Sequence, residues 1–366
     1  MTVSLTEEKT EAIIVSIRTI LQEKFPTIRH VCQIIGKILA TAPANAYARL
    51  HVTNLMLERD QALQNSDQDY DQVMALSNIV KDDLELQIER LPLAITPLHR
   101  ATPNMVIFTD ASDDGWGVHS LQSGSFGGRW SDEEYDWHIN TQETMAIWLA
   151  IQYILRNISN IHVRIRCDNT TAIAAVRKQG DLNNSCRNQI TRDIWEFIIV
   201  RNIWLSITRI AGVDNVLADE ASIVFIESEE TSMSRDMFQR IISIFGEPEI
   251  DLFASRLNYK LHTYAAWKPD PGAIIIDSLA EHWGWWKFVY CFPPTCLIAR
   301  TIQKIQFEYI HGLLVVPENR MAVWYSVMRR IQIGDHFNFL VNEDNLHNIQ
   351  DFHFHKEGSL MRVIRF

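Results

Sequence analysis

Four acidic residues in the middle of the chain have the types and positions needed to bind metal ions. Asp110 and Asp168 each end an apolar run, in IFTDAS and in RIRCDNTTA. Glu143 lies in the first turn of an expected helix, and Asp219 lies at the start of another, in DNVLADEAS. Clusters of carboxylate oxygens suit Mg²⁺ or Mn²⁺. Two such ions can activate a water molecule and stabilise the leaving oxygen of a phosphodiester.

Each acid also has an ordinary structural explanation. Asp110 and Asp168 fit turns that follow strands, and Asp219 fits a helix N-terminus. Asn140 and Glu143 fit a capping box in which Asn140 is the N-cap. We favour the metal-binding hypothesis because all four acids fall at expected element ends within one compact segment. If the two strands are neighbours, their carboxylates emerge at one edge and repel each other unless cations neutralise them.

The elements that must position these acids are visible in the pattern of residues 104–225. Short β-branched runs separated by glycine turns predict strands, and apolar residues at helical spacing predict helices. The strand-like runs are 105–112, 115–122, 125–130, 161–168 and 204–211, and the expected helices are 141–157, 170–178, 185–201 and 216–222. This order predicts an α/β domain with a mixed five-stranded sheet and flanking helices.

The rest of the chain divides around this segment. Residues 1–103 are expected to be helical, because isoleucines recur at helical spacing, and they end in a proline-bearing connector. Residues 226–334 are expected to form a smaller α/β domain rich in aromatic residues, and residues 335–366 a C-terminal tail.

Several long motifs resemble a known family. The stretches TDASDDGWG, HINTQE, CDN, QGD and NVLAD resemble the RNase H domain of retroelement polymerases, and more narrowly of DIRS-type retrotransposons. The first 91 residues resemble the thumb or connection that follows the reverse-transcriptase palm in those elements. The segment EIDLFASRLNYKLHTYAAWKPDPGA and the later HWGWWKFVYCFPPTCLIARTIQKI resemble a downstream domain related to phage Dam-type adenine methyltransferases. The resemblance covers most of residues 1–334.

The resemblance implies a function and a set of site residues. It implies hydrolysis of the RNA strand of an RNA–DNA hybrid by two Mg²⁺ or Mn²⁺ ions held by the four acids. It also implies polar contacts to ribose or phosphate, for which the candidates are Ser112, Asn140, Asn169, Thr170, Asn215 and Arg209. The family often has histidine and proline where this chain has Arg209 and Ala211, so we expect no mobile histidine before Asp219.

The methyltransferase signature is altered. That class has a polar residue, two prolines and an aromatic residue around the flipped adenine. The matching residues are Phe292, Pro293, Pro294 and Thr295, so both the polar and the aromatic positions are lost. Asp251 and Asp277 match S-adenosylmethionine contacts by resemblance, although surface turns explain them better. We therefore expect no S-adenosylmethionine binding and an inactive or repurposed domain.

Composition sets further limits. The chain has 366 residues and a net charge of −11, with no apolar run long enough to span a membrane and no signal-peptide pattern at its start. Five scattered cysteines suit a reducing compartment, so we expect an intracellular protein, cytoplasmic or nuclear. The acidic balance does not exclude a nucleic-acid substrate, since four of the acids belong to the expected metal site.

Three other functions fit parts of the sequence. A non-catalytic nucleic-acid-binding remnant fits the missing palm and the altered methyltransferase signature. A DNA adenine methyltransferase fits the downstream domain alone. A DDE transposase shares the layout of sheet and acids, but Glu143 between two strand aspartates favours RNase H. We expect RNA–DNA hybrid as the substrate, with the polymerase palm and other element-encoded proteins as partners, and no membrane.

Overall fold

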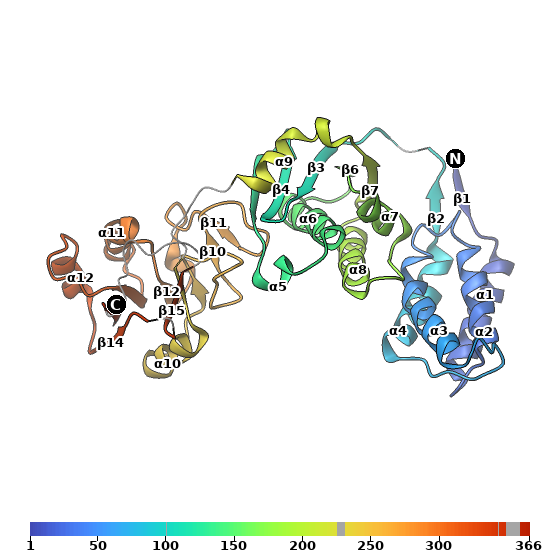
Figure 1. Cartoon of the computed structure of the whole chain (residues 1–366), viewed down its shortest axis with the longest axis horizontal. Helices are drawn as coiled ribbons and strands as arrows, with labels where there is room; N and C mark the ends of the chain where they lie inside the picture. Colours follow the sequence, from blue (N-terminus) through green and yellow to red (C-terminus); the bar gives the residue numbers. More distant parts are fainter. Residues whose placement is uncertain (100, 225–230, 343, 349–358) are drawn as a thin grey trace. The chain divides into compact units, whose positions relative to one another are not determined.

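The computed structural model describes residues 1–99, 101–224, 231–342, 344–348 and 359–366 (Figure 1). Two compact units are present, Met1–Val224 and Phe225–Phe366. The boundary expected near residue 226 lies outside the described residues. Among the described residues, none of the helices combines the length and apolar character that a membrane span needs.

The first part of the first unit is a helical segment. Its elements are β1 (Thr2–Ser4), α1 (Glu7–Gln22), α2 (Ile28–Leu39), η1 (Leu50–Val52), α3 (Thr53–Asn65), α4 (Asn78–Arg90), η2 (Leu91–Leu93) and β2 (Ile95–Pro97). Thr6, Thr27 and Ser77 cap α1, α2 and α4, because each side chain accepts a hydrogen bond from a backbone N–H in the first turn. The isoleucines at helical spacing in α1 and α2 form the core of this segment.

The second part of the first unit is a five-stranded mixed sheet, which confirms the expected RNase H-like fold class. Its elements are β3 (Met105–Ala111), β4 (Gly115–Ser120), β5 (Gly124–Arg129), α5 (Asp132–Tyr135), α6 (Ile139–Ile154), β6 (His162–Cys167), α7 (Thr170–Lys178), α8 (Ser185–Val200), β7 (Trp204–Arg209), η3 (Gly212–Asp214) and α9 (Val216–Ile223). The strand order is β5-β4-β3-β6-β7. Strands β3, β4 and β5 pair antiparallel, whereas β3, β6 and β7 pair parallel.

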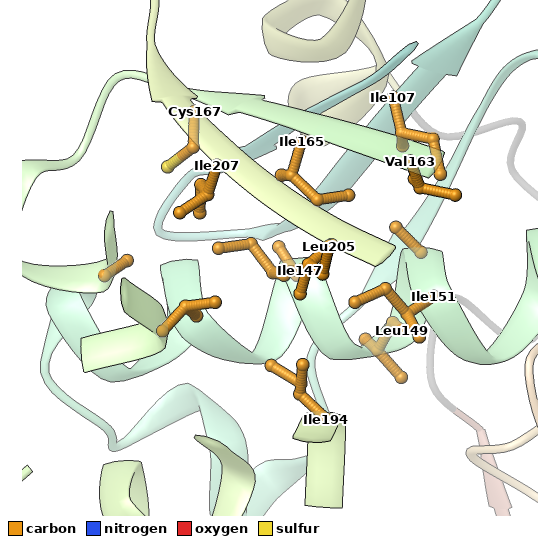
Figure 2. Packing of buried hydrophobic residues seen from close by; sticks show 14 of the residues in the cluster. Ile107, Ile147, Leu149, Ile151, Val163, Ile165, Cys167, Ile194, Leu205 and Ile207 are labelled. Atoms are coloured by element: carbon orange, nitrogen blue, oxygen red, sulfur yellow. The ribbon is translucent and has the colours of Figure 1, made fainter. Parts of the chain in front are cut away.

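One face of this sheet packs on α6 and α8. Strands β6 and β7 alternate, so that every second side chain is buried on the helix side. Figure 2 shows Ile165 and Leu205 from the sheet facing Ile147 of α6 and Ile194 of α8. This apolar layer fixes α6, and therefore the position of Glu143, which is the fifth residue of that helix.

Helix α9 packs on the opposite side of β3, β4 and β5. Two glycines permit a very close approach. A Cβ at Gly117 would overlap the carbonyl oxygen of Ala218, and one at Gly127 would overlap that of Ala221. The helix that carries Asp219 therefore rests directly on the backbone of the sheet.

Polar contacts join the helical segment to the sheet domain. The Gln179 side chain donates to Ala46 O at 2.6 Å and accepts from Leu50 N at 3.2 Å. Arg192 of α8 donates two hydrogen bonds to Asp83 of α4, at 2.7 and 2.8 Å. Because Asp83 is buried, this charged pair fixes the position of α4 against α8.

The second unit is also α/β. Its elements are β8 (Thr231–Met233), α10 (Arg235–Phe245), β9 (Ile250–Asp251), β10 (Ala265–Ala266), β11 (Ile275–Ile276), η4 (Trp283–Trp285), β12 (Val289–Cys291), η5 (Thr295–Leu297), α11 (Ile298–Glu308), β13 (Gly312–Pro317), α12 (Tyr325–Ile331), β14 (His336–Leu340), β15 (Leu346–Asn348) and β16 (Leu360–Arg365). Its main sheet has the order β14-β16-β13-β12-β9. The segment expected to be a tail therefore contributes β14 and β16 to this sheet.

Replacing Gly117 with valine is expected to push α9 off the sheet. Because the new side chain meets backbone atoms that cannot rotate away, we expect a loss of at least about 2 kcal/mol in the free energy of unfolding. Urea titration followed by circular dichroism measures it. Gly36→Ala is the control, since nothing lies within 4 Å of a Cβ there. Because Gly36 is exposed within α2, Gly36→Ala should raise the free energy of unfolding by about 0.5–1 kcal/mol. Equal effects of the two substitutions would contradict the close approach.

Candidate functional site

The four predicted acids lie at the ends of neighbouring elements. Asp110 is the next-to-last residue of strand β3, and Asp168 directly follows β6. Because β3 and β6 are parallel neighbours, both carboxylates emerge at the same edge of the sheet. Glu143 comes from α6 on one side and Asp219 from α9 on the other. Asp110 and Glu143 are buried, Asp168 is half-buried and Asp219 is exposed.

Three potential ligand atoms form the tightest group at this edge. Those of Glu143, Cys167 and Asp168 all lie within 4.8 Å of one another. The Cys167 thiol donates a hydrogen bond to Glu143 Oε2, with a sulfur–oxygen distance of 3.6 Å. Burial strongly raises the pKa of Cys167, and the neighbouring Glu143 raises it further. The thiol therefore remains protonated and acts as a hydrogen-bond donor.

The electrostatics show that these carboxylates repel one another. Burial raises the pKa of Glu143 to about 9, and the charges of Asp110 and Asp168 add to the effect. Burial also raises the pKa of Asp110 to about 6, with further contributions from Asp168 and Asp219. Each of the four acids thus affects, or is affected by, another of them. This coupling places them in one cluster.

Asp110 is held in place by two side chains from the region of α9. Asn215 Nδ2 donates to Asp110 Oδ1 at 3.2 Å and to the Thr109 carbonyl at 3.0 Å. The Ser222 hydroxyl donates to Asp110 Oδ2 at 3.2 Å. Both bonds favour the charged carboxylate and partly offset the rise in its pKa. Asn215 is buried, so it is more than a surface turn residue.

Asn140 does not cap its helix, and that part of the prediction is wrong. Helix α6 begins at Ile139, and His138 is the N-cap, with its Nδ1 accepting from Asn140 N at 3.1 Å. The Asn140 side chain instead accepts a hydrogen bond from Asn169 Nδ2 at 2.9 Å. Asn169 is the N-cap of α7, because its Oδ1 accepts from two backbone N–H groups. The two asparagines form a bridge beside Asp168.

The other predicted contact residues differ in their accessibility. The Ser112 hydroxyl donates to Ser222 O at 2.6 Å and accepts from the turn before β4, so it is engaged within the protein. Thr170 is exposed at the start of α7, and Arg209 is exposed at the end of β7. Lys178 is also exposed, as its surface interpretation predicts.

Sequence reasoning missed Cys167 and Ser222. Cys167 directly precedes Asp168, and its inward position in the alternating strand was a usable signal for a buried thiol. Ser222 lies three residues after Asp219, one helical turn away. Its contact with Asp110 spans 112 positions, which local pattern does not reveal.

The residues of the altered methyltransferase signature lie in the second unit. Asp251 ends β9 and is buried, and it accepts backbone hydrogen bonds from Phe253 and Lys260. The expectation of a surface turn is therefore wrong for Asp251. It fits Asp277, which is exposed with a φ of 58°.

The FPPT stretch follows β12. Phe292 packs against an apolar cluster, Pro293 is buried, and Pro294 and Thr295 lead into η5. The first position of the stretch is thus an apolar side chain packed into the core of the second unit.

The donor set of the acid cluster fits hard divalent cations. It offers carboxylate oxygens, which Mg²⁺ and Mn²⁺ prefer, and its only sulfur within this group is protonated. Burial, and then the neighbouring carboxylates, raise the pKa of Asp110 and of Glu143, so a bound cation would favour the ionised form of these acids. Asp110, Glu143, Asp168 and Asp219 are thus the residues that could bind such ions.

Strand order, register and the acids at the strand ends define an RNase H-like domain. No model of a known protein family matches the chain. The enzymatic polyprotein of cauliflower mosaic virus, strain NY8153, is 31% identical over 153 residues, which cover 35% of this chain and 20% of that protein. The Strasbourg strain gives the same identity and coverage. The chain spans about a fifth of the length of these relatives and shares homology with them over that stretch.

Solved structures give similar matches. RNase H1 from the archaeon Halobacterium salinarum NRC-1 has 20% identity and a TM-score of 0.25, covering 32% of this chain and 96% of that one. The foamy viral protease-reverse transcriptase in complex with RNA/DNA hybrid has 11% identity and a TM-score of 0.23, covering 63% and 32%. Because these scores are low, the fold class rests on the strand order and register.

Stability of the metal-free protein is expected to fall as pH rises. A carboxyl whose pKa is raised by folding binds its proton more tightly in the folded state. The protonated Glu143 carboxyl group therefore contributes fully to the free energy of unfolding below about pH 4. This contribution is lost as the pH rises toward about 9. Glu143→Gln removes this loss, so its free energy of unfolding relative to wild type should grow between pH 5 and pH 8 by on the order of 2 kcal/mol.

Urea titration in EDTA at both pH values measures this difference. Glu85→Gln removes an exposed carboxylate from α4 and should change stability equally at the two pH values. Adding Mg²⁺ at pH 8 should stabilise the wild type more than Glu143→Gln, because ions that bind the folded state shift the equilibrium. A parallel pH response of wild type and Glu143→Gln would refute the clustered charge.

Proposed function

We propose that the chain is the RNase H of a DIRS-type retroelement polymerase and hydrolyses the RNA strand of RNA–DNA hybrids. The observation that carries the proposal is the cluster of Asp110, Glu143, Asp168 and Asp219 at one edge of an RNase H-like sheet. Homology to a viral enzymatic polyprotein supports the retroelement origin. The polymerase palm and other element-encoded proteins are the proposed partners, in the cytoplasm or nucleus.

The four acids would hold two divalent cations. When bound, such ions activate a water molecule and stabilise charge on the leaving oxygen. The protein's own contribution is to fix the carboxylates: Asn215 and Ser222 orient Asp110, and Cys167 orients Glu143. Since these donors are buried, the carboxylates keep their geometry before substrate arrives.

Recognition of RNA would depend on the polar groups beside the acids. The 2′-hydroxyl distinguishes RNA from DNA and can both donate and accept a hydrogen bond. The Asn169 side chain accepts hydrogen bonds from the first turn of α7 through Oδ1 and donates one to Asn140 Oδ1 through Nδ2. The Nδ2 group of Asn140 would then be the donor to ribose. Thr170 and Arg209 are exposed, and we expect them to contact phosphate.

A non-catalytic nucleic-acid-binding remnant is the second candidate. Arg209 and Ala211 stand where the family often has histidine and proline, and this departure lies beside Asp219. The DNA adenine methyltransferase alternative has less support, because Phe292 replaces the polar residue of its signature. Turnover of hybrid separates the first two candidates.

Cleavage of a labelled RNA–DNA hybrid tests the proposal. The wild type should cut the RNA strand with Mg²⁺ or Mn²⁺ and stop in EDTA. Asp110→Asn, Glu143→Gln and Asp168→Asn should each lower the rate by about 10²-fold or more. Glu220→Gln is the matched control, since it removes an exposed carboxylate next to Asp219. Equal cleavage by Asp110→Asn and wild type would exclude catalysis at this site, and hybrid binding without turnover would favour the remnant.

The asparagine bridge gives a separate prediction. Asn140→Ala should raise the KM for hybrid without changing thermal stability, because its side chain caps no helix. Asn169→Ala should raise KM and also cost about 1 kcal/mol of stability, since it removes the α7 cap. Steady-state kinetics and thermal unfolding measure the two effects. A large stability loss in Asn140→Ala with unchanged KM would contradict a role in substrate contact.

A further inference from the structure

The sheet face opposite α6 and α8 carries basic, polar and aromatic side chains. We call this the outer face. Because side chains alternate along each strand, it is formed by every second residue of β3 to β7. Its members are Val106, Phe108, His119, Ser125, His162, Arg164, Arg166, Trp204, Ser206 and Thr208. Except for exposed Ser125, all are half-buried.

Strand register arranges this face in rows. Ser125 pairs with His119, His119 with Phe108, Phe108 with Arg166, and Arg166 with Thr208, so one row crosses all five strands. Asp110 lies two residues beyond Phe108 on β3. Residues two apart on a strand are separated by roughly 7 Å. The row therefore borders the acid cluster, on the same side of the sheet as α9.

Two arginines on this face have no acidic partner among the described residues. Arg164 and Arg166 are neighbours on β6, and the Nε atom of each is buried with no hydrogen-bond partner. Among the described residues, neither guanidinium forms an ion pair within 4 Å, although the whole chain carries a net charge of −11. Holding positive charge half-buried disfavours the free protein, and a polyanion that binds there would offset that cost.

Aromatic rings lie beside Arg166, in the same row of the sheet. The Arg166 guanidinium is 5.7 Å from the Phe108 ring centroid, and the rings of Phe108 and His119 are 5.9 Å apart. His162 is fixed by Ala101 O at 2.8 Å and by the Ser206 hydroxyl at 2.9 Å. Sheets that present rings beside cations offer stacking surfaces for bases and charge for phosphates.

We propose that the outer face binds a single-stranded segment of nucleic acid. Arg164 and Arg166 contact successive parts of the phosphate backbone, and Phe108 and His119 stack on bases. A single strand is the occupant that this face fits, because its phosphates and its bases can contact the arginines and the neighbouring rings at the same time. The proposal does not depend on hydrolysis at the acid cluster, so each can fail without the other.

Fluorescence anisotropy of the full chain tests this surface. The probes are labelled oligouridine and oligothymidine of about 12 nucleotides, with EDTA present so that no strand is cut. We expect Arg164→Gln/Arg166→Gln to weaken binding about tenfold and to reduce the slope of log affinity against log salt by about 1.4, since each phosphate contact contributes about 0.7. Phe108→Leu should weaken binding and leave that slope unchanged. Comparison of the two probes shows whether the occupant is RNA, DNA or either.

Two controls keep the test specific. Lys9→Gln/Arg18→Gln removes the same charge from exposed positions on α1 and should leave affinity unchanged. Arg164→Lys/Arg166→Lys keeps both charges and should retain the salt slope of the wild type. The proposal is overturned if neither probe binds, if a folded Arg164→Gln/Arg166→Gln protein binds as the wild type does, or if the α1 control loses affinity equally.

Discussion

The burial of acidic side chains beside one another is the constraint on which the architecture of this site depends. Asp110 and Glu143 are buried near Asp168, and burial and like charge raise the pKa of both. Such an arrangement persists only if packing elsewhere holds the elements together. The apolar layer between the sheet and α6, and the close seat of α9, supply that support.

The same sheet separates charge along its strands. Acids lie at the ends of β3 and β6, while Arg166 and Arg164 lie one and two rows back on β6. A polyanion would be attracted to the positive face. It would be repelled by the negative edge unless cations are bound there, so the two regions together would orient it. The net acidity of the chain therefore hides a local pattern that a total charge does not show.

Sequence patterns predicted much of this unit for clear physical reasons. Alternation along β6 and helical spacing along α8 are local signals, and both elements were found within a residue or two of their ends. The positions of the four acids could be predicted because each acid lies near the end of such an element. The start of α6 was predicted two residues too late, because His138 is the N-cap and the Asn140 side chain contacts Asn169 instead. The Asp110–Ser222 contact and the two strands formed by residues 336–340 and 360–365 depend on long-range pairing that no local pattern encodes.

The close packing of α9 on Gly117 and Gly127 has a consequence for folding during synthesis. During synthesis, N-terminal parts of a chain generally fold first. Strands β3 to β7 emerge from the ribosome before α9, which brings Asn215, Asp219 and Ser222 together. The acid cluster is thus completed by the last helix of its unit. A nascent chain therefore carries Asp110 without its two hydrogen-bond donors until Asn215 and Ser222 have been synthesised.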